Sequence, residues 1–581
     1  WLISGLDVIY QAFFNLKNKM LLAEHFLMSV ATIGAIIIGE YDEAAMVMVL
    51  FQLGEMLEDR AVNKSRQSIA DLMNIQTPIA YRLINDEIEE IESDEIEIGD
   101  LIQVRVGDKI PVDGLIVQGK SSLDMKALTG ESMPVGVFHG DEVLSGSINL
   151  ESALIIEAKK SVFDSTANKI VELLEEATEN QAKTESLITK FAKIYTPIVV
   201  AFALAIALIP PIIWGQDFFE WLRRGLIFLV VSCPCAFVVS VPMAFVTGLG
   251  VSSKLGILIK GGNVIENLSN IKFIASDKTG TLTQGNFEIT DIKTRAGVDQ
   301  EKLLAIAAGM ELGFTHPIAK AILNLAKEKS VKLEGLIEVK NIPGRGVEAK
   351  HQNSGLILGS STLLKENGVS IPEINTSGTL VYLGQVYPEK AYLGHFIIKD
   401  EIKQNAKESI NKLRTKGVEK IVMLTGDSKE VAEVVASELD LDDFKYKMLP
   451  QDKLGYVINS QDDIAFIGDG LNDAPVLAAS KVGIAMGGIG SDASIEAADV
   501  VIINDDLSLV GDALEICKYT FAIAKQNIIL SLGIKLIFLI LSAFGMTAMW
   551  MAVFADVGVT LLAIANTFRI YLFYNKLKRN K

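Results

Sequence analysis

Six long apolar stretches restrict the fold of this chain more than any other feature of its sequence. A helix needs about 20 mostly apolar residues to cross ~30 Å of membrane hydrocarbon, and each stretch comes close to that length. They form three pairs, at about residues 21–38 and 44–57, 194–214 and 226–252, and 527–544 and 547–573. Because each pair returns the chain to the side from which it came, the polar blocks at about 58–193 and 254–525 must face the same side of a membrane.

Charged residues indicate that this side is the cytosol, because cytoplasmic loops of membrane proteins carry an excess of Lys and Arg. Basic clusters flank the polar blocks and the C-terminus, at Lys17 and Lys19; Arg60, Lys64 and Arg66; Lys254 and Lys260; and Lys576, Lys578 and Arg579. Arg223 and Arg224 are an exception, since the pairing of the spans places them on the outer side. The 3 cysteines form no disulfide framework, which fits a reducing cytosol.

The composition fits a membrane protein with large water-soluble parts. Half of the 581 residues are hydrophobic, yet 22% are charged. The 54 basic residues against 72 acidic residues give a net charge of −18, which repels nucleic acid, so we expect no nucleic-acid partner. The chain begins at Trp1, and its first apolar run, residues 1–14, is short for a span. We therefore expect an N-terminally trimmed protein that starts inside a membrane helix.

The two polar blocks predict different folds. In the first, from about 78 to 160, apolar and polar residues alternate between Gly-Asp turns, which predicts a small β-rich domain. In the second, strand-like runs at 271–276, 421–424 and 464–467 alternate with helical patterns such as 403–416. This alternation is typical of βαβ units and a parallel sheet. The character of the sequence changes from about 287 to 396, so we expect one doubly wound domain that is split by an insertion.

Acidic residues follow two of these predicted strands. Asp277 comes directly after the first strand, so its carboxylate should lie at the carboxyl edge of the sheet, where it is placed to act as a nucleophile. Asp469 and Asp473 follow the strand at 464–467 in a glycine-rich segment. Three carboxylates at one edge repel one another unless a cation joins them, and hard oxygen ligands favour Mg²⁺.

A third strand adds groups that suit phosphoryl transfer. It ends in Thr425, Gly426 and Asp427, whose hydroxyl and backbone amides could hold phosphoryl oxygens. Lys453 supplies a cation for the negative charge that spreads over these oxygens during transfer.

In this order, the segments 277–281, 425–427, Lys453 and 468–475 resemble the motifs of the haloacid-dehalogenase superfamily and, more narrowly, of the P-type ATPases. The resemblance implies an α-helical transmembrane bundle with a cytosolic β-rich actuator domain, an α/β phosphorylation domain and an inserted α+β nucleotide-binding domain. It implies ATP and Mg²⁺ as substrate and cofactor, with Asp277, Thr279, Asp469 and Asp473 around the magnesium. Thr279 stands where superfamily phosphatases usually carry a second Asp, so the aspartyl-phosphate should hydrolyse slowly unaided.

The same resemblance assigns roles outside the phosphorylation domain. Glu131, in the segment 128–132, resembles the actuator residue that positions the water for dephosphorylation. His316, Gly344 and Gly346 match nucleotide-pocket positions of the heavy-metal branch. Thr315 departs from the Glu often found before that His, and Glu311 is the residue that we expect to compensate.

The fourth complete span contains Cys233, Pro234 and Cys235 near its middle. Proline removes an amide donor and opens the backbone locally, so both thiols can turn inward. Thiolates select soft or borderline ions such as Cu(I), Zn²⁺, Cd²⁺ and Pb²⁺. Lys535 and Asp556 lie in the last two spans, where a charge at mid-bilayer costs at least ~2.5 kcal/mol, so we expect them to face the interior and each other.

Charge matching favours a divalent ion at this predicted site. Two thiolates and one carboxylate carry three negative charges, which over-neutralise Cu(I) but suit a divalent ion when a lysine shares the site. Cys-Pro-Cys with this Lys and Asp resembles the zinc/cadmium/lead subgroup, and Lys535 could then act as a built-in counterion that draws Asp556 away when the site opens outward. Glu55, near the end of the second complete span, is either part of an ion path or a solvated helix end.

Together these features predict a monomeric, multi-pass plasma (inner) membrane pump that exports Zn²⁺, Cd²⁺ or Pb²⁺ from the cytosol, with membrane lipid and the transported ion as partners. A Cu(I) pump of the same fold and a membrane-anchored phosphatase or metal-sensing ATP binder are the alternatives. The predicted boundaries are 1–72 for a truncated helix and the first pair, 73–182 for the actuator domain, 183–265 for the Cys-Pro-Cys pair, 266–286 and 399–518 for the phosphorylation domain, 287–398 for the nucleotide-binding domain and 519–581 for the last pair.

Overall fold

The structure is a computed structural model that describes residues 2–17, 24–73, 77–84, 87–125, 134–232, 235–314, 317–342, 345–351, 354–372, 374, 378–469, 473–487 and 496–579. The chain divides into two compact units, which we describe separately. The first comprises Trp1–Asn270 and Asp512–Lys581, and the second comprises Ile271–Gly511.

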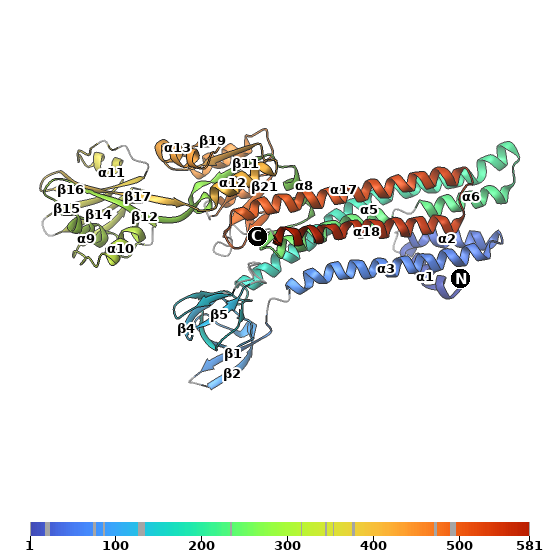
Figure 1. Cartoon of the computed structure of the whole chain (residues 1–581), viewed down its shortest axis with the longest axis horizontal. Helices are drawn as coiled ribbons and strands as arrows, with labels where there is room; N and C mark the ends of the chain where they lie inside the picture. The colour runs from blue at the N-terminus through green and yellow to red at the C-terminus, as the bar shows by residue number, and fades with distance from the viewer. Residues whose placement is uncertain are drawn as a thin grey trace. The chain divides into compact units, whose positions relative to one another are not determined.

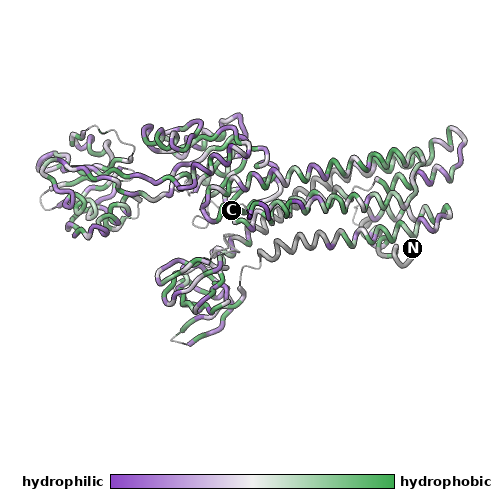
Figure 2. The backbone as a smooth tube through the Cα atoms, viewed as in Figure 1, coloured by the Kyte–Doolittle hydropathy of each residue, from purple (hydrophilic) through white to green (hydrophobic). Residues whose placement is uncertain are grey.

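Long helices make up most of the first unit (Figure 1). They are α1 (Leu2–Lys17), α2 (Glu24–Ile37), α3 (Tyr41–Met73), α5 (Thr166–Trp214), α6 (Phe218–Val231), α7 (Cys235–Ser253), α8 (Gly262–Asn270), α17 (Ser508–Ala543) and α18 (Met549–Arg579). Within the described residues, three helical segments are long and apolar enough to cross a membrane: Pro197–Trp214 of α5, the whole of α17 and the whole of α18. His25–Ile37 and Val238–Ser253 are shorter apolar helices. Figure 2 shows many hydrophobic residues, interspersed with polar ones, along α17 and α18.

The packing of these helices places α18 at the centre of several contacts. It packs against α7, α3 and α6. Small residues such as Ala31, Ala35 and Ala44 are completely buried in the shared core with Met28 and Met48. Small side chains let helix backbones approach closely, which is the usual basis of helix packing in a membrane.

The structure corrects two helix boundaries expected from hydropathy. The apolar stretch at 226–252 is not one helix, because α6 ends at Val231 and α7 begins at Cys235. The apolar stretch at 194–214 is only the end of α5, which begins at Thr166 and runs for 49 residues. Hydropathy could not reveal this earlier start, because polar residues interrupt the apolar ones throughout the added segment.

The β-rich domain of the first unit has two antiparallel sheets. The larger has the order β2-β1-β3-β9-β4-β7, and the smaller has the order β6-β5-β8. Their strands are β1 (Ile79–Ile84), β2 (Glu87–Glu92), β3 (Leu101–Val104), β4 (Gly114–Gln118), β5 (Ser121–Asp124), β6 (Val135–Val137), β7 (Glu142–Val143), β8 (Ile148–Asn149) and β9 (Leu154–Ala158). Alternate residues such as Ile102, Val104, Leu154 and Ile156 fill one core, as the alternating sequence predicts.

A parallel sheet forms the base of the second unit. Its strands lie in the order β22-β21-β20-β11-β18-β19. They are β11 (Phe273–Asp277), β18 (Lys420–Leu424), β19 (Asp443–Lys445), β20 (Ile464–Gly468), β21 (Val482–Met486) and β22 (Val500–Ile502). The accompanying helices are α12 (Ala406–Thr415), α13 (Lys429–Glu438), α14 (Pro450–Ile458) and α15 (Ala474–Ala479). Strands β11, β20 and β21 are buried along their whole length, which explains why β20 and β21 contain no polar side chain and why β11 is apolar up to Ser276.

An antiparallel domain is inserted after β11, as the sequence predicts. Strands β12 (Thr283–Thr294) and β17 (Ala391–Ile402) pair with each other and connect it to the parallel sheet (Figure 1). The remaining strands are β13 (Ile337–Ile342), β14 (Gly346–His351), β15 (Ser354–Gly359) and β16 (Thr379–Tyr387), with helices α9 (Gln300–Met310), α10 (Pro317–Glu328) and α11 (Ser361–Glu366). Both of the larger helices, α9 and α10, contribute to its main core.

Candidate phosphorylation and metal-transport sites

Three neighbouring strands bring the predicted phosphoryl-transfer residues to one edge of the parallel sheet. Strand β11 lies between β18 and β20 and runs parallel to both. In this register Asp277 lies opposite Leu424, and the segments that begin with Thr425 and Asp469 follow directly after the two flanking strands. The carboxyl edge of such a sheet is where α/β proteins bind their ligands.

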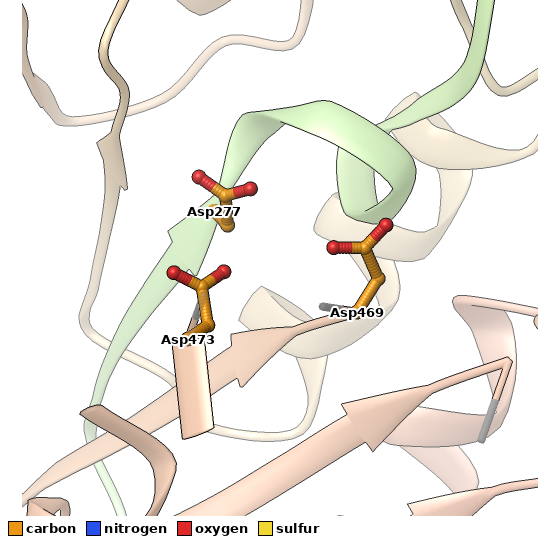
Figure 3. Close-up of side chains that lie close together, drawn as sticks. All are labelled: Asp277, Asp469 and Asp473. Carbon is orange, nitrogen blue, oxygen red and sulfur yellow. The ribbon is translucent and has the colours of Figure 1, made fainter. Parts of the chain in front are cut away.

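Carboxylates gather at this edge, as Figure 3 shows. One oxygen each of Asp277, Asp469 and Asp473 lies within 4.8 Å of the others. The Lys453 Nζ atom lies 2.7 Å from Asp277 Oδ1 and 2.9 Å from Asp473 Oδ1. Three carboxylates against one ammonium leave two negative charges in excess when all are ionised, which fits a divalent hard cation such as Mg²⁺.

The electrostatics of the cluster show the same excess of negative charge. Burial raises the pKa of Asp277 to about 6, with a further rise from Asp473 and an opposing effect of Lys453. Burial raises the pKa of Asp469 to about 7, and Asp277 and Asp473 add to this rise. Burial lowers the pKa of Lys453, but its two carboxylate partners outweigh this effect and the net shift is upward. Lys453 therefore stays an ammonium, while the acids favour neutralisation by a proton or a cation.

The turn after Asp277 depends on a glycine. Gly280 has a positive φ of 72°, and a Cβ atom there would lie 1.6 Å from Asp469 Oδ2. Any other residue would collide with the carboxylate cluster and adopt a strained backbone. Thr279, which precedes it, interrupts the helical turn with an extended conformation (φ −74°, ψ 127°). The segment 278–282 therefore wraps around Asp469.

Three buried residues that sequence reasoning missed hold this turn in place. The Lys278 Nζ atom lies 2.7 Å from Asp427 Oδ2 and 3.6 Å from Asp400 Oδ2. The Lys403 Nζ atom donates to the Gly280 carbonyl at 2.9 Å. Lys278 could have been suspected from its place beside the nucleophile, whereas Lys403 and Asp400 give no signal because their contacts join segments more than 100 residues apart.

The loop after β18 is held by local and long-range bonds. The Asp427 amide donates to Thr425 Oγ1 at 3.2 Å, and the Lys447 amide donates to the Asp427 carbonyl at 2.8 Å. Thr425 is buried, and Gly426 lies between these two anchored residues. The structure thus brings Asp277, Thr425, Lys453, Asp469 and Asp473 to one edge and ties Asp427 to them through Lys278.

The nucleotide-pocket residues are only partly described. Glu311 follows α9 with 7% of its surface exposed, and burial raises its pKa to about 7. Gly346 begins β14, and a Cβ atom there would lie 2.1 Å from the Leu358 carbonyl oxygen, so pairing with β15 also explains this glycine. His316, Gly344 and the actuator residue Glu131 lie outside the described residues.

Two charged side chains meet between the last two membrane helices. The Lys535 Nζ atom of α17 lies 2.6 Å from Asp556 Oδ1 of α18, and each side chain is 8% exposed. These residues face each other, as their place in apolar helices predicts. Cys233 and Pro234 lie outside the described residues, and Cys235 begins α7 after the interruption that follows Val231.

Other charged residues of the membrane helices also find partners. The His25 Nε2 atom of α2 lies 3.1 Å from Glu55 Oε1 of α3, so Glu55 contacts a neighbouring helix. On the predicted outer side, the Arg223 Nη1 atom lies 3.7 Å from Glu43 Oε1, and the Arg224 Nη2 atom lies 3.1 Å from Glu220 Oε1. Nearby acids therefore accompany the two arginines that break the charge rule.

Comparison with known proteins identifies the family. Residues 74–175 match the P-type ATPase actuator domain, and residues 271–481 match the haloacid dehalogenase-like hydrolases. The cadmium, zinc and cobalt-transporting ATPase of Bacillus subtilis (strain 168) is 43% identical over 99% of this chain and 82% of its own length. The zinc-transporting ATPase of Synechocystis sp. is 42% identical over 98% of this chain and 79% of its own length.

A solved structure agrees with these relatives. The crystal structure of a zinc-transporting PIB-type ATPase in the E2·Pi state matches 98% of this chain and 94% of its own, with 36% identity and a TM-score of 0.59. The chain belongs to the heavy-metal-transporting P-type ATPases. This result confirms the predicted family, the predicted multidomain fold class and the predicted activity as an ATPase.

Proposed function

We propose that this chain uses ATP to export Zn²⁺ or Cd²⁺ from the cytosol through an aspartyl-phosphate intermediate, and that Pb²⁺ is carried in the same way. The observation that carries the proposal is the buried Lys535–Asp556 pair, in which the Nζ and Oδ1 atoms lie 2.6 Å apart between two apolar helices. A charged pair inside a membrane is costly and marks an ion path or a coupling site. The names of the similar ATPases, which carry cadmium and zinc, point to the same ions.

Phosphorylation begins at Asp277. Its carboxylate attacks the γ-phosphorus of ATP, the bond to the β,γ-bridging oxygen breaks, and ADP leaves. Lys453, 2.7 Å from this carboxylate, stabilises the charge that spreads over the phosphoryl oxygens. Thr425 and the backbone of Gly426 hold those oxygens, and Asp427 fixes the loop through Lys278.

The magnesium ligands would be Asp277, Asp469, Asp473 and Thr279. The excess of carboxylates over ammonium groups fits this ion, and bound Mg²⁺ would neutralise the phosphate charge at the reacting edge. Glu311, His316, Gly344 and Gly346 form the nucleotide pocket in this proposal. Each of these assignments rests on the motifs and on the charge of the described residues.

Dephosphorylation needs a second domain. Thr279 offers no acid or base beside Asp277, so the aspartyl-phosphate persists until Glu131 of the actuator domain directs a water molecule to it. The water oxygen attacks phosphorus, the bond to the Asp277 carboxylate breaks, and phosphate leaves. Because ATP and this water must reach Asp277 in different steps, the actuator domain must move between them.

The transported ion is held by Cys233, Cys235 and Asp556, with Lys535 as a nearby cation. Two thiolates, one carboxylate and one ammonium give two net negative charges, which match one divalent soft ion. When the site opens outward, Lys535 pairs with Asp556 and promotes release. Glu55, 3.1 Å from His25, contributes to the path by which the ion enters.

The pump is proposed to work as a monomer in the plasma (inner) membrane with its soluble domains in the cytosol. All of the proposed site residues belong to one chain. The basic clusters beside the apolar helices favour the cytosolic orientation of these domains.

The test uses the purified protein in sealed vesicles with the ATP-binding domains outside. ATP with Zn²⁺ or Cd²⁺ should cause metal to accumulate inside and should place phosphate on Asp277, and the variant Cys233→Ala should do neither. Cys517→Ala is the matched control, because Cys517 is a buried cysteine of α17 outside the proposed site. Stimulation by Cu(I) alone, or ATP hydrolysis that ignores every metal, would contradict the proposal.

A further inference from the structure

A buried aspartate of the actuator domain has no role in the proposal so far. Asp113 precedes β4, and only 5% of its surface is exposed. Its Oδ1 atom accepts from the Ser145 amide at 2.8 Å, and its Oδ2 atom accepts from the Thr166 hydroxyl at 2.8 Å. The Thr166 amide donates to both oxygens at 3.1 and 3.2 Å, and the Lys160 Nζ atom lies 3.1 Å from Oδ2. Three separate segments therefore meet at one carboxylate.

This carboxylate binds the first turn of α5 from outside the helix. The first amides of a helix have no partner within it, and the positive end of the helix dipole attracts an anion. Here the Thr166 amide bonds Asp113, and the Ala167 amide bonds Ser145 Oγ at 2.8 Å. Only the Asn168 amide uses a local cap, Ser165 Oγ at 3.4 Å. The start of α5 is thus bonded to residues that lie 22 and 53 positions earlier in the chain.

The same helix reaches the predicted metal site. α5 is continuous from Thr166 to Trp214. Tyr195 of this helix is hydrogen-bonded to Ser232, the residue before Cys233. At 1.5 Å per residue, the 29 residues from Thr166 to Tyr195 span roughly 44 Å. A proline can bend a helix, but Pro197 lies beyond Tyr195, so the segment between the actuator and Tyr195 contains no proline.

We infer that Asp113 is a positioning residue that fixes the actuator domain to α5, so that each movement of the actuator is delivered to the metal site. The inference rests on the proposed function, in which the actuator moves between phosphorylation and hydrolysis. If the bond to α5 is lost, the actuator reaches the phosphoenzyme without moving α5. Phosphate is then released without the matching release of metal.

The test compares Asp113→Asn with the wild type in zinc-transporting vesicles. The asparagine keeps the shape but loses the negative charge, and its amide group faces other donors. We expect ATP-dependent phosphorylation and hydrolysis within about twofold of the wild type, and at least about a threefold fall in Zn²⁺ transported per phosphate released. Ser145→Ala and Thr166→Val each remove one of the hydrogen bonds between the actuator domain and the start of α5. Each should lower the amount of Zn²⁺ transported per phosphate released by a smaller factor.

Asp141→Asn is the matched control. Asp141 lies in the same domain, but it is exposed, and among the bonds that the structure describes its carboxylate accepts only from the nearby Phe138 amide, at 2.8 Å. It should leave the ratio unchanged. If Asp113→Asn fails to fold, the Ser145 and Thr166 variants decide the question.

Variants that lower the melting temperature but keep the wild-type ratio would show a purely structural role and overturn the inference. The proposed function fails separately, since in that case the wild type itself would transport no Zn²⁺.

Discussion

Two buried lysines of this chain meet aspartates in opposite ways. Lys453 lies between Asp277 and Asp473, with Asp469 beside them, so the phosphorylation cluster keeps an excess of negative charge. Among the residues that the structure describes, Lys535 forms an ion pair only with Asp556, so the membrane pair is balanced. The first arrangement attracts a cation permanently, whereas the second keeps charge neutralised inside the membrane. In the proposed function, this difference would let one chain bind Mg²⁺ at the phosphorylation cluster and still release a transported ion from the membrane site.

The surroundings explain why each arrangement persists. Removing one partner of a buried ion pair leaves an uncompensated charge, which costs about 3 to 5 kcal/mol. In the cytosolic cluster, a proton or a metal ion can enter from water and restore the balance. Inside the membrane, water supplies no proton or metal ion to neutralise Asp556, so Lys535 of the protein itself provides the opposite charge.

The largest expected effect comes from replacing Asp277, the proposed phosphate acceptor. Asp277→Asn removes the nucleophile but leaves Lys453 paired with Asp473, so the sheet edge should stay folded. We expect phosphorylation by ATP to fall by at least ~10³-fold, because an amide cannot form the acyl-phosphate. Acid-stable labelling with γ-labelled ATP measures this loss.

The control for this prediction is Asp443→Asn, a half-exposed aspartate of the same domain that pairs with Lys445. Its labelling should match the wild type. Labelling of Asp277→Asn at the wild-type level would show that the acceptor is another residue.

A pair of double-mutant cycles tests the contrast between balanced and unbalanced sites. Lys535→Met should destabilise the protein by about 3 to 5 kcal/mol, and adding Asp556→Asn should recover most of this loss, because both charges are then gone. In the cluster, Lys453→Met with Asp277→Asn should stay destabilised, because Asp473 and Asp469 still lack a cation. Denaturant unfolding in Mg²⁺-free detergent solution measures the change in the free energy of unfolding for each single and double variant of the two cycles. Equal recovery in the two cycles would remove the distinction that we draw.

Magnesium should stabilise only the unbalanced site, and more at high pH. The folded-state pKa values of Asp277 and Asp469, about 6 and 7, lie above the ordinary carboxyl value. The folded state therefore holds more protons than the unfolded chain, and stability should fall by about 2 to 4 kcal/mol as pH rises from 5 to 8. Millimolar Mg²⁺ should reverse most of this loss at pH 8 and little of it at pH 5.

Thermal unfolding of the nucleotide-free protein across this pH range measures the effect. Asp469→Asn should weaken both the pH dependence and the response to Mg²⁺. A Mg²⁺ effect that is the same at both pH values would contradict the assignment of these acids as the source.

The smallest expected effect concerns Glu311, for which the structure describes neither an ammonium nor a guanidinium partner. Burial alone raises its pKa to about 7, so its ionised form costs stability above that pH. Glu311→Gln should therefore stabilise the nucleotide-binding domain by about 1 to 2 kcal/mol at pH 8 relative to pH 5. Thermal unfolding without nucleotide measures it, and Glu301→Gln, an acid in the first turn of the same helix, is the control. A gain that is independent of pH would indicate a packing effect.

Much of the fold could be predicted because its signals are local. Apolar runs of sufficient length predict the membrane helices. In the phosphorylation domain, Asp277, Thr425 and Asp469 each come at the end of an apolar strand or directly after it. Parallel strands bring their carboxyl ends to one edge, so the gathering of these residues follows from the order of elements. The end of α6 at Val231 agrees with the local opening of the backbone that Pro234 predicts, because proline cannot continue the hydrogen-bonding pattern of a helix.

Contacts between distant segments could not be predicted in the same way. The bonds of Lys278 to Asp400 and of Lys403 to Gly280 join residues more than 100 positions apart. A lysine in a sequence predicts a surface residue. Only the tertiary structure shows that Lys278 and Lys403 are buried beside carboxylates. The early start of α5 has the same origin, since Asp113 and Ser145 satisfy its first amides from elsewhere in the chain.

The amino-acid sequence by itself predicted the membrane segments, the cytosolic side and Asp277 as the phosphate acceptor, because these predictions follow from hydrophobic length, charge bias and motif order. The tertiary structure alone decided that Lys453 serves two aspartates while Lys535 serves one, and that the actuator is bonded to α5. Such pairings depend on the distance between side chains in space. That distance is set by the packing of whole sheets and helices, and the spacing of residues along the chain does not encode it.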